Sequence, residues 1–316
     1  MPPLRIIFMG TADLACASLQ ALSRVVEFQI LAVVSQPDKP KGRDLRLQPT
    51  PVKAAALAAG LPVLQPERAR EAGFIEQLRQ LQPDLIVVAA YGQILPQAIL
   101  DLPRFGCLNV HTSLLPKYRG AAPIQWAILD GESETGVTIM KMDAGLDTGA
   151  ILTQATTPIA PEDTGQTLHD RLAQLGGELL VRTIPDSIEG RVAPRPQPAE
   201  GVSHARKITK ADGQLDWAQP ARSLWNRVRA FTPWPGAFTH RRSESGAHVL
   251  KIWTAQVVEA SSGSPGELLS ADKTGIVVGS GQGALRILQL QREGGRRLTA
   301  QEFLAGNPMS PGERLG

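Results

Sequence analysis

Residues 107–116 read CLNVHTSLLP, and this stretch decides the fold that the rest of the sequence completes. Gly106 precedes its short apolar run, and a loop rich in proline and glycine follows it. The pattern predicts a buried strand whose carboxyl end opens into a surface loop. Ligands of open α/β sheets bind beyond the carboxyl ends of the strands, so we expect a site at this point.

Two polar side chains mark that strand end. If residues 108–111 are extended, Asn109 and His111 point to the same face, because side chains alternate along a strand. An amide can stabilise a developing oxyanion, and an imidazole can carry a proton.

A third polar group follows in residues 136–150, which read GVTIMKMDAGLDTGA. The alternation over 137–142 indicates a strand, and the glycines around Asp147 indicate a tight turn. An aspartate in that turn could orient the histidine and stabilise its charge. The alternative is that Asp147 serves only the turn, as aspartates in glycine-rich turns commonly do.

Three motifs together resemble the formyltetrahydrofolate-dependent formyltransferases: NVHTSLLP at 109–116, RGAAPIQ at 119–125 and DAGLDTG at 143–149. The resemblance extends from residue 4 to about residue 290. It implies that Asn109, His111 and Asp147 form the catalytic trio. It also implies that the folate site is lined by Ser113, Leu114, Leu115 and Pro116, and by Tyr91, Ile94 and Leu95 after the preceding strand.

The composition limits the classes of protein to which this chain can belong. A chain of 316 residues, 42% hydrophobic and 20% charged, fits two globular domains. No apolar run approaches the ~20 residues of a membrane span, and the first ten residues do not form a signal peptide. Cys16 and Cys107 form no CxxC pair, so neither a disulfide framework nor a thiolate zinc site is expected. We expect a cytoplasmic monomer that uses no metal.

Positive charge is concentrated in residues 201–316, which carry 15 Lys and Arg against 9 Asp and Glu, a surplus of six. The whole chain has 33 against 30, so the remainder has 18 against 21, a deficit of three. A basic half suggests a polyanionic partner, although a merely solvated basic surface would look the same.

The first half predicts a Rossmann-like, doubly wound parallel sheet. Strands at 4–10 and 28–35 enclose a helix at 12–25, and 84–91 is the most apolar strand and should lie centrally. Gly10 stands without a GxGxxG fingerprint, which disfavours a nicotinamide cofactor. The other expected elements are helices at 51–60, 67–81, 97–102, 123–130 and 164–188, a strand at 61–64, and an edge hairpin at 137–142 and 150–156.

A basic segment at 36–49 interrupts the α/β rhythm. It carries Lys39, Lys41, Arg43 and Arg46 among prolines and glycines, and we expect a long loop that contacts phosphates. The resemblance implies that this insertion enters the acceptor end of initiator tRNA, with Arg43 as the basic residue after the glycine. The alternative is an exposed linker with charges for solubility.

Residues 190–208 form a proline-rich linker between a catalytic domain at 1–189 and a smaller domain at 209–316. In the latter a helix at 221–231 precedes short strands at 238–239, 249–258, 275–278 and 284–290, which predicts a small closed barrel. RAFTPWP at 229–235 resembles the OB-like, tRNA-binding domain of the formyltransferases that act on initiator tRNA.

The hypothesis is therefore transfer of formyl from 10-formyltetrahydrofolate, the co-substrate, to the α-amino group of methionyl-initiator tRNA. Three alternatives stay open. The acceptor could be an amino sugar nucleotide or glycinamide ribonucleotide, or the chain could be a nucleic-acid-binding module with an inert α/β domain. The basic loop argues against the first, the second domain against the second, and the intact trio against the third.

Overall fold

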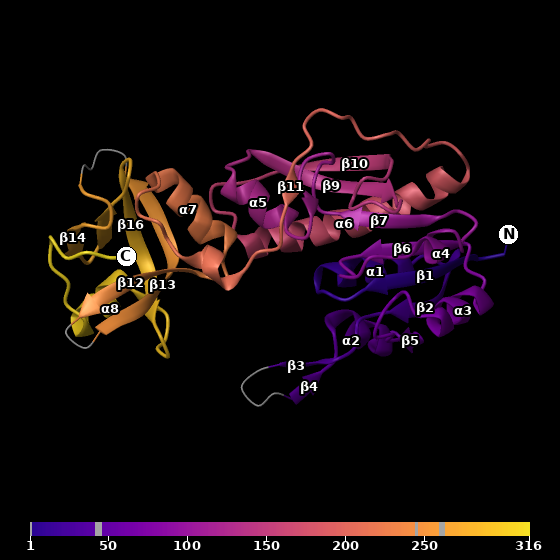
Figure 1. Ribbon diagram of the computed structural model, residues 1–316, viewed down its shortest axis with the longest axis horizontal. Coiled ribbons are helices and arrows are strands. Elements are labelled where there is room, and N and C mark those ends of the chain that lie inside the picture. The colour runs from indigo at the N-terminus through magenta and orange to yellow at the C-terminus, as the bar shows by residue number, and fades with distance from the viewer. Residues whose placement is uncertain (1, 42–45, 244–245, 259–262) are drawn as a thin grey trace. The chain divides into compact units, whose positions relative to one another are not determined.

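The computed structural model describes residues 2–41, 46–243, 246–258 and 263–316 (Figure 1). The chain forms two compact units. The first unit comprises Met1–Pro123, Glu134–Pro158 and His169–Ala205, and the second comprises Ile124–Ser133, Ile159–Leu168 and Arg206–Gly316.

The first unit is built on a seven-stranded sheet in the order β10-β9-β7-β6-β1-β2-β5. Its strands are β1 (Leu4–Gly10), β2 (Phe28–Val34), β5 (Val63–Leu64), β6 (Leu85–Ala89), β7 (Cys107–His111), β9 (Glu134–Lys141) and β10 (Ile151–Pro158). The run from β7 to β5 is parallel, whereas β9 and β10 are antiparallel. The apolar strand β6 is central and β9–β10 is an edge hairpin, which confirms both predictions.

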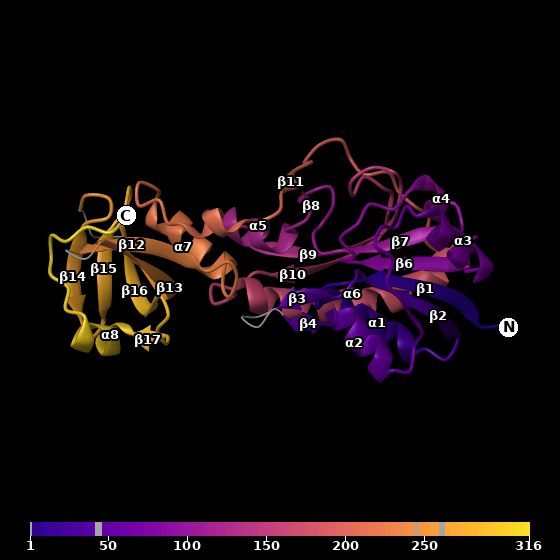
Figure 2. The same cartoon turned by 60° about the horizontal axis from the view of Figure 1, so that its bottom comes forward.

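Helices cover both faces of this sheet, as the doubly wound prediction requires. On one face α1 (Leu14–Ser23) packs against β1, β2 and β6, and α2 (Pro51–Ala58) packs against α1 and β2. Figure 2 shows α6 (Gly165–Ile188) on the same side. On the other face α3 (Ala72–Gln80) and α4 (Gln97–Leu100) share an apolar core with side chains of β1, β6 and β7.

Two glycines let α6 pack closely, one against the sheet and the other against α1. A Cβ on Gly176 would lie 2.8 Å from Cγ1 of Val110 in β7, and one on Gly177 would lie 3.0 Å from the carbonyl oxygen of Ala17 in α1. Val110 lies between Asn109 and His111, so α6 packs against the strand that carries both. Bare glycine backbone is what such an approach needs.

Two expected elements differ from the structure. The helix predicted at 67–81 is shorter, because the N–H groups of Arg68 and Ala69 are bonded to the side chains of Glu71 and Gln93 instead of entering a helical ladder. The segment predicted as an irregular loop at 36–49 contains two paired strands, β3 (Lys39–Lys41) and β4 (Arg46–Gln48). Arg43 lies outside the described residues.

The second unit contains the sheet β12-β13-β16-β15-β14, with β17 paired to β16. Its strands are β12 (Ala237–Ser243), β13 (Gly246–Val258), β14 (Leu268–Asp272), β15 (Gly275–Gly279), β16 (Ala284–Arg292) and β17 (Leu298–Thr299). Isolated bridges join Leu315 to Arg241 in β12, and Arg314 to Glu267 beside β14. The last residues thus link the two edge strands, which closes the sheet in the manner of a small barrel.

Helices α7 (Ala221–Ala230) and α8 (Ala300–Gly306) pack on this sheet around an apolar core that includes Leu224 and Phe303. Sequence reasoning missed α8, although Thr299 and Glu302 form the capping box that marks its start. It also missed β14. Within the described ranges, no helix is long and apolar enough to cross a membrane.

Candidate active site

Three polar side chains meet at the carboxyl end of β7. Asn109 Nδ2 lies 3.4 Å from Asp147 Oδ1, and His111 Nδ1 lies 3.7 Å from Asp147 Oδ2. Asn109 and Asp147 are half-buried, and His111 is buried. The alternation along β7 brings amide and imidazole to one face, and the β9–β10 hairpin brings the carboxylate back to them.

The imidazole has a defined tautomer. His111 Nε2 lies 2.9 Å from the carbonyl oxygen of Tyr118, and a carbonyl can only accept a hydrogen bond, so Nε2 carries a proton. In the neutral ring Nδ1 is then unprotonated, and it is the nitrogen that faces Asp147. At 3.7 Å that pair is too long for a hydrogen bond, and the carboxylate attracts the imidazole by charge only when the ring is protonated.

Hydrogen bonds also fix the carboxylate. Asp147 Oδ2 accepts the backbone N–H of Gly120 at 2.8 Å. Tyr118 and Gly120 therefore hold the histidine and the aspartate, respectively, from the same short loop. Both contacts are made by backbone groups, so no side-chain motif announces them in the sequence.

Unfavourable backbone conformations gather around this cluster. Ala90, Tyr118 and Asp147 have φ values of 43°, 61° and 52°, in the left-handed region that side-chain-bearing residues rarely adopt. Ala90 follows β6, whose neighbour in the sheet is β7. Strained residues persist where the surrounding structure over-determines them, and they cluster at functional sites.

The predicted folate-lining residues fall into two groups. In the loop after β7, Ser113 and Leu115 are buried, and Leu114 and Pro116 are half-buried. Ser113 Oγ donates to the carbonyl of Lys117 at 2.6 Å, so its hydroxyl serves the loop.

After β6, Tyr91 and Leu95 are buried and Ile94 is 82% exposed. The Tyr91 ring packs in the core, and its hydroxyl has no hydrogen-bond partner among the described residues, while its carbonyl accepts bonds from Thr11 and Gln36. Burial, with a smaller contribution from Glu71, raises the pKa of Tyr91 to about 12. The Tyr91 side chain therefore serves the core, whereas Ile94 offers an exposed apolar side chain.

Two of the basic residues predicted to bind tRNA, Lys39 and Arg46, lie in the β3–β4 hairpin and not in this cluster. Lys39 pairs with Gln48, and Lys41 with Arg46, in the β3–β4 hairpin. Lys39 and Arg46 are exposed.

An ion pair anchors the base of that hairpin. Asp38 Oδ2 accepts from Lys53 at 2.6 Å and its Oδ1 accepts from Gln65 at 2.7 Å. The bond from Lys53, then that from Gln65, lowers the pKa of Asp38. The hairpin thus has a fixed base beneath its exposed cations.

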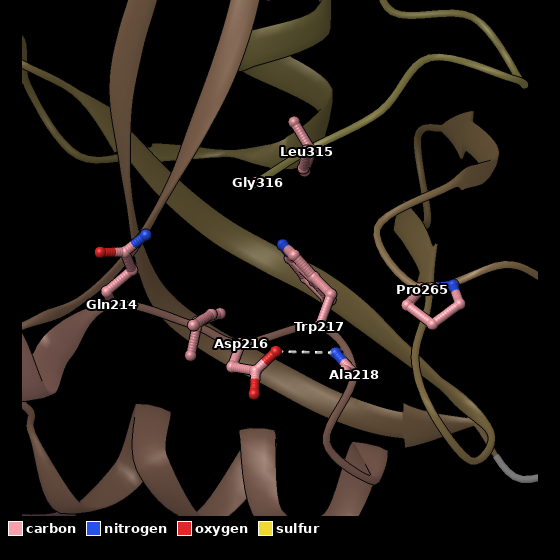
Figure 3. Close-up of a pocket in the computed structure, with 8 residues that line it drawn as sticks. Gln214, Asp216, Trp217, Ala218, Pro265, Leu315 and Gly316 are labelled. Atoms are coloured by element: carbon pink, nitrogen blue, oxygen red, sulfur yellow. Dashed lines mark hydrogen bonds between the residues drawn. The ribbon is translucent and has the colours of Figure 1, made fainter.

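A hollow of about 590 Å³ in the second unit holds no comparable chemistry (Figure 3). Among the described residues that line it, the one titratable side chain is that of Asp216, which accepts the N–H of Ala218 at 3.1 Å and a bond from Gln219 at 3.1 Å. The bond from Gln219, followed by that from Ala218, lowers the pKa of Asp216. This carboxylate stabilises a turn and has no acid–base partner in the hollow.

One group in the described part of the chain brings metal-ligand atoms within 4.8 Å of one another: Asp13, His169 and Asp170. Both aspartates are exposed, and His169 Nδ1 lies 2.9 Å from Asp170 Oδ1. Exposed acidic groups of this kind are common without a metal, and none of the three belongs to the trio at β7.

Family models match both parts of the chain. The formyl transferase model matches residues 4–184, and the model of the formyl transferase C-terminal domain matches residues 207–308. The methionyl-tRNA formyltransferase of Geobacter metallireducens is 48% identical over 316 residues, which is 100% of each chain. That of Aromatoleum aromaticum is 50% identical over 313 residues, 99% of this chain and 97% of its own.

Solved structures show the same fold at lower identity. WlaRD, a sugar 3N-formyl transferase solved in the presence of dTDP and 5-N-formyl-THF, has a TM-score of 0.65 at 20% identity, covering 92% of this chain and 97% of its own. HypX from Aquifex aeolicus in complex with tetrahydrofolic acid has a TM-score of 0.61 at 18% identity, covering 99% and 50%.

Proposed function

The chain belongs to the methionyl-tRNA formyltransferase family, and on that premise we propose that it transfers the formyl group of 10-formyltetrahydrofolate to the α-amino group of methionyl-initiator tRNA. The observation that carries the proposal is the meeting of Asn109, His111 and Asp147 at the carboxyl end of β7. It supplies a hydrogen-bond donor, a proton carrier and a fixed negative charge at one point.

The strand ends beside the trio suit a flat folate ring. Ile94 exposes an apolar side chain after β6, and the loop after β7 presents Leu114 and Pro116 at its half-buried surface. β6 and β7 are neighbours, so these two segments leave the sheet side by side. The bound folate supplies the formyl group, and these segments would hold its ring so that the formyl carbon lies at the trio.

The first step requires the protein to accept a proton and stabilise an oxyanion. The amine's lone pair forms a bond to the formyl carbon while the carbonyl electrons move to oxygen. Asn109 Nδ2–H is the donor placed to stabilise that oxygen. His111 Nδ1, unprotonated because Nε2 holds the proton bonded to Tyr118, accepts the proton that the attacking nitrogen loses.

The second step returns that proton. The imidazolium formed at His111 lies 3.7 Å from the Asp147 carboxylate, which stabilises the added charge. Nδ1–H can then donate to the oxyanion, and it protonates the folate nitrogen as the bond to the formyl carbon breaks. His111 is therefore an oxyanion donor only while it is protonated. The products are the formamide and tetrahydrofolate.

The second unit offers cationic and aromatic groups for the acceptor. The guanidinium of the exposed Arg297 lies 3.8 Å from the ring centroid of Trp253. Trp234 is 53% exposed. We assign residues 209–316 to tRNA binding, residues 1–189 to catalysis and residues 190–208 to the connection between them. A cytoplasmic monomer that needs no metal completes the proposal.

The β3–β4 hairpin gives the sharpest test of the acceptor. Arg43→Ala should lower kcat/KM for initiator methionyl-tRNA by ~10²-fold, because misplacing a reactant by about 1 Å costs that much. Folate binding and Tm should stay nearly unchanged, since the sequence around Arg43 is too polar and proline-rich for a core segment, and substitutions outside the core rarely exceed about ±0.5 kcal/mol. Lys39→Ala and Lys41→Ala should have weaker effects that fade as salt rises. Parent-like formylation by all three variants across a salt series would exclude the hairpin from tRNA binding.

A further inference from the structure

The segment that follows the catalytic domain is tied to the first unit at two places. Arg195 pairs with Ile151 at the start of β10, through two backbone hydrogen bonds of 2.8 Å. Further on, β11 (His204–Ala205) pairs in parallel with β8 (Arg119–Gly120). We call residues 195–205 the strap. Its two anchors adjoin the two segments that hold the trio, the Asp147 turn and the Tyr118–Gly120 loop.

Between these anchors, the amide of Gln197 joins the same two segments directly. Its Nε2 donates to the carbonyl oxygens of Asp147 at 2.7 Å and Gly149 at 2.8 Å. Its Oε1 accepts from Arg119 Nε at 3.0 Å and from a terminal guanidinium nitrogen at 2.7 Å. Two donors and one acceptor in one group are the property of an amide, and Gln197 uses all of them.

The turn at residues 143–149, which carries Asp147, needs such a support because several of its side chains are exposed and do not anchor it in the core. Asp143 and Leu146 are exposed, and Asp147 itself has the left-handed φ of 52°. Within the turn, Asp143 Oδ1 accepts from Gly145 N at 3.0 Å and from Thr148 at 2.7 Å. Gly120 holds the Asp147 side chain from outside the turn, and Gln197 holds the backbone of the turn, with one of its bonds to the carbonyl of the strained residue.

We propose that Gln197 is a positioning residue for formyl transfer: it fixes the Asp147 carboxylate against His111 by tying the 143–149 turn to the Tyr118–Gly120 loop. This rests on the proposed function only for its effect on rate. Gln197 touches no reacting atom and acts through Asp147. The charge interaction over 3.7 Å between Asp147 and His111 has no hydrogen bond to keep it in register, so its geometry depends on the turn.

The decisive substitutions separate the two halves of the amide. Gln197→Met keeps the length and removes every hydrogen bond, and kcat should fall about 10- to 100-fold, as expected for a displacement on the order of 1 Å. Gln197→Glu still pairs with Arg119 but cannot donate to the two carbonyls, so its kcat should fall by the same factor. Full activity of Gln197→Glu would mean that Gln197 merely holds Arg119, and would overturn the proposal. Gln97→Met, at an exposed i,i+4 contact with Asp101, is the matched control and should behave as the parent.

Coupling to Asp147 distinguishes positioning from general loss of structure. In an Asp147→Asn background, Gln197→Met should lower kcat by less than about threefold, because the carboxylate that Gln197 positions is gone. Additive losses would contradict the proposal. The KM for the folate should change little in either background.

Hydrogen exchange tests the same contact without any activity. Backbone amides of residues 143–149 should exchange faster in Gln197→Met than in the parent, while those of β6 stay unchanged. If the parent does not formylate methionyl-tRNA, the proposed function fails and this exchange measurement still decides the role of Gln197. Equal exchange in the turn would overturn that role.

Discussion

Asp147→Asn probes the trio most directly, because its cost follows from the observed contacts. The carboxylate accepts from Gly120 N at 2.8 Å through Oδ2 and faces Asn109 Nδ2 at 3.4 Å through Oδ1. An asparagine amide has one oxygen, so whichever way it turns, its NH₂ faces one of these donors. The clash between the two donors at Asn109 is removed only if the Asn109 amide flips. The flip puts the carbonyl oxygen of Asn109 where its N–H donor was.

The lost charge adds to that effect. Unit charges separated by the 3.7 Å between His111 Nδ1 and Asp147 Oδ2 interact by about 1 kcal/mol in water and about 4.5 kcal/mol at an effective dielectric constant of about 20. The half-buried carboxylate lies between these limits. At 1.36 kcal/mol for each tenfold change, kcat should fall about 10- to 10³-fold.

The assay is single-turnover formyl transfer to charged initiator methionyl-tRNA, with folate affinity and Tm measured in parallel. Folate affinity should hold, because the carboxylate acts on charge that develops mainly in the transition state. The control is Asp101→Asn, which removes an exposed carboxylate of the same unit. An Asp147→Asn enzyme that is well folded and within twofold of the parent would refute the assignment of Asp147.

Three further predictions concern the trio, the sheet and the hairpin. Asn109→Ala should lower kcat by roughly 10²–10³-fold with little change in folate affinity, as for loss of one oxyanion donor, and parent-like turnover would exclude that role. Gly176→Ala should lower the free energy of unfolding by about 1 kcal/mol, since overpacking against Val110 outweighs the gain in helix propensity. The control is Gly73→Ala in α3, where no atom lies within 4 Å of the new Cβ, and this substitution should raise the free energy of unfolding by up to about 1 kcal/mol. Equal signs in urea denaturation would contradict this reading of α6. The pairing that lowers the pKa of Asp38 stabilises the fold when pH lies above the ordinary carboxyl pKa, and this contribution is lost as pH falls through the lowered pKa. Lys53→Met removes the pairing, so Tm should drop less between pH 7 and pH 3 in this variant than in the parent.

The sheet was predictable where the hydrophobic pattern is strong. The apolar run of β6 indicates a central strand, and the alternation over 137–142 indicates the edge hairpin, because the pattern of apolar and polar residues in a strand follows which of its faces are buried. The β3–β4 pairing was not predictable, since its strands are short and rich in lysine, arginine and proline.

For the candidate site, the sequence indicates side chains but not the backbone groups around them. Asn109, His111 and Asp147 carry motifs, and the structure places them together. The carbonyl of Tyr118 and the N–H of Gly120 could not be inferred, because any residue type supplies a backbone group.

The proline-rich segment at 190–208 was predicted to be a spacer. Nothing in its composition indicates that Gln197 reaches the Asp147 turn, because that contact depends on the path of the chain.

The most direct test of the central claim is formyl transfer by the purified parent from 10-formyltetrahydrofolate to three acceptors in parallel. These are charged initiator methionyl-tRNA, an amino sugar nucleotide and glycinamide ribonucleotide. We predict rapid formylation of the methionyl-tRNA alone, measured as formylmethionine released from the tRNA. Faster transfer to either small amine, or no transfer to methionyl-tRNA, would contradict the account.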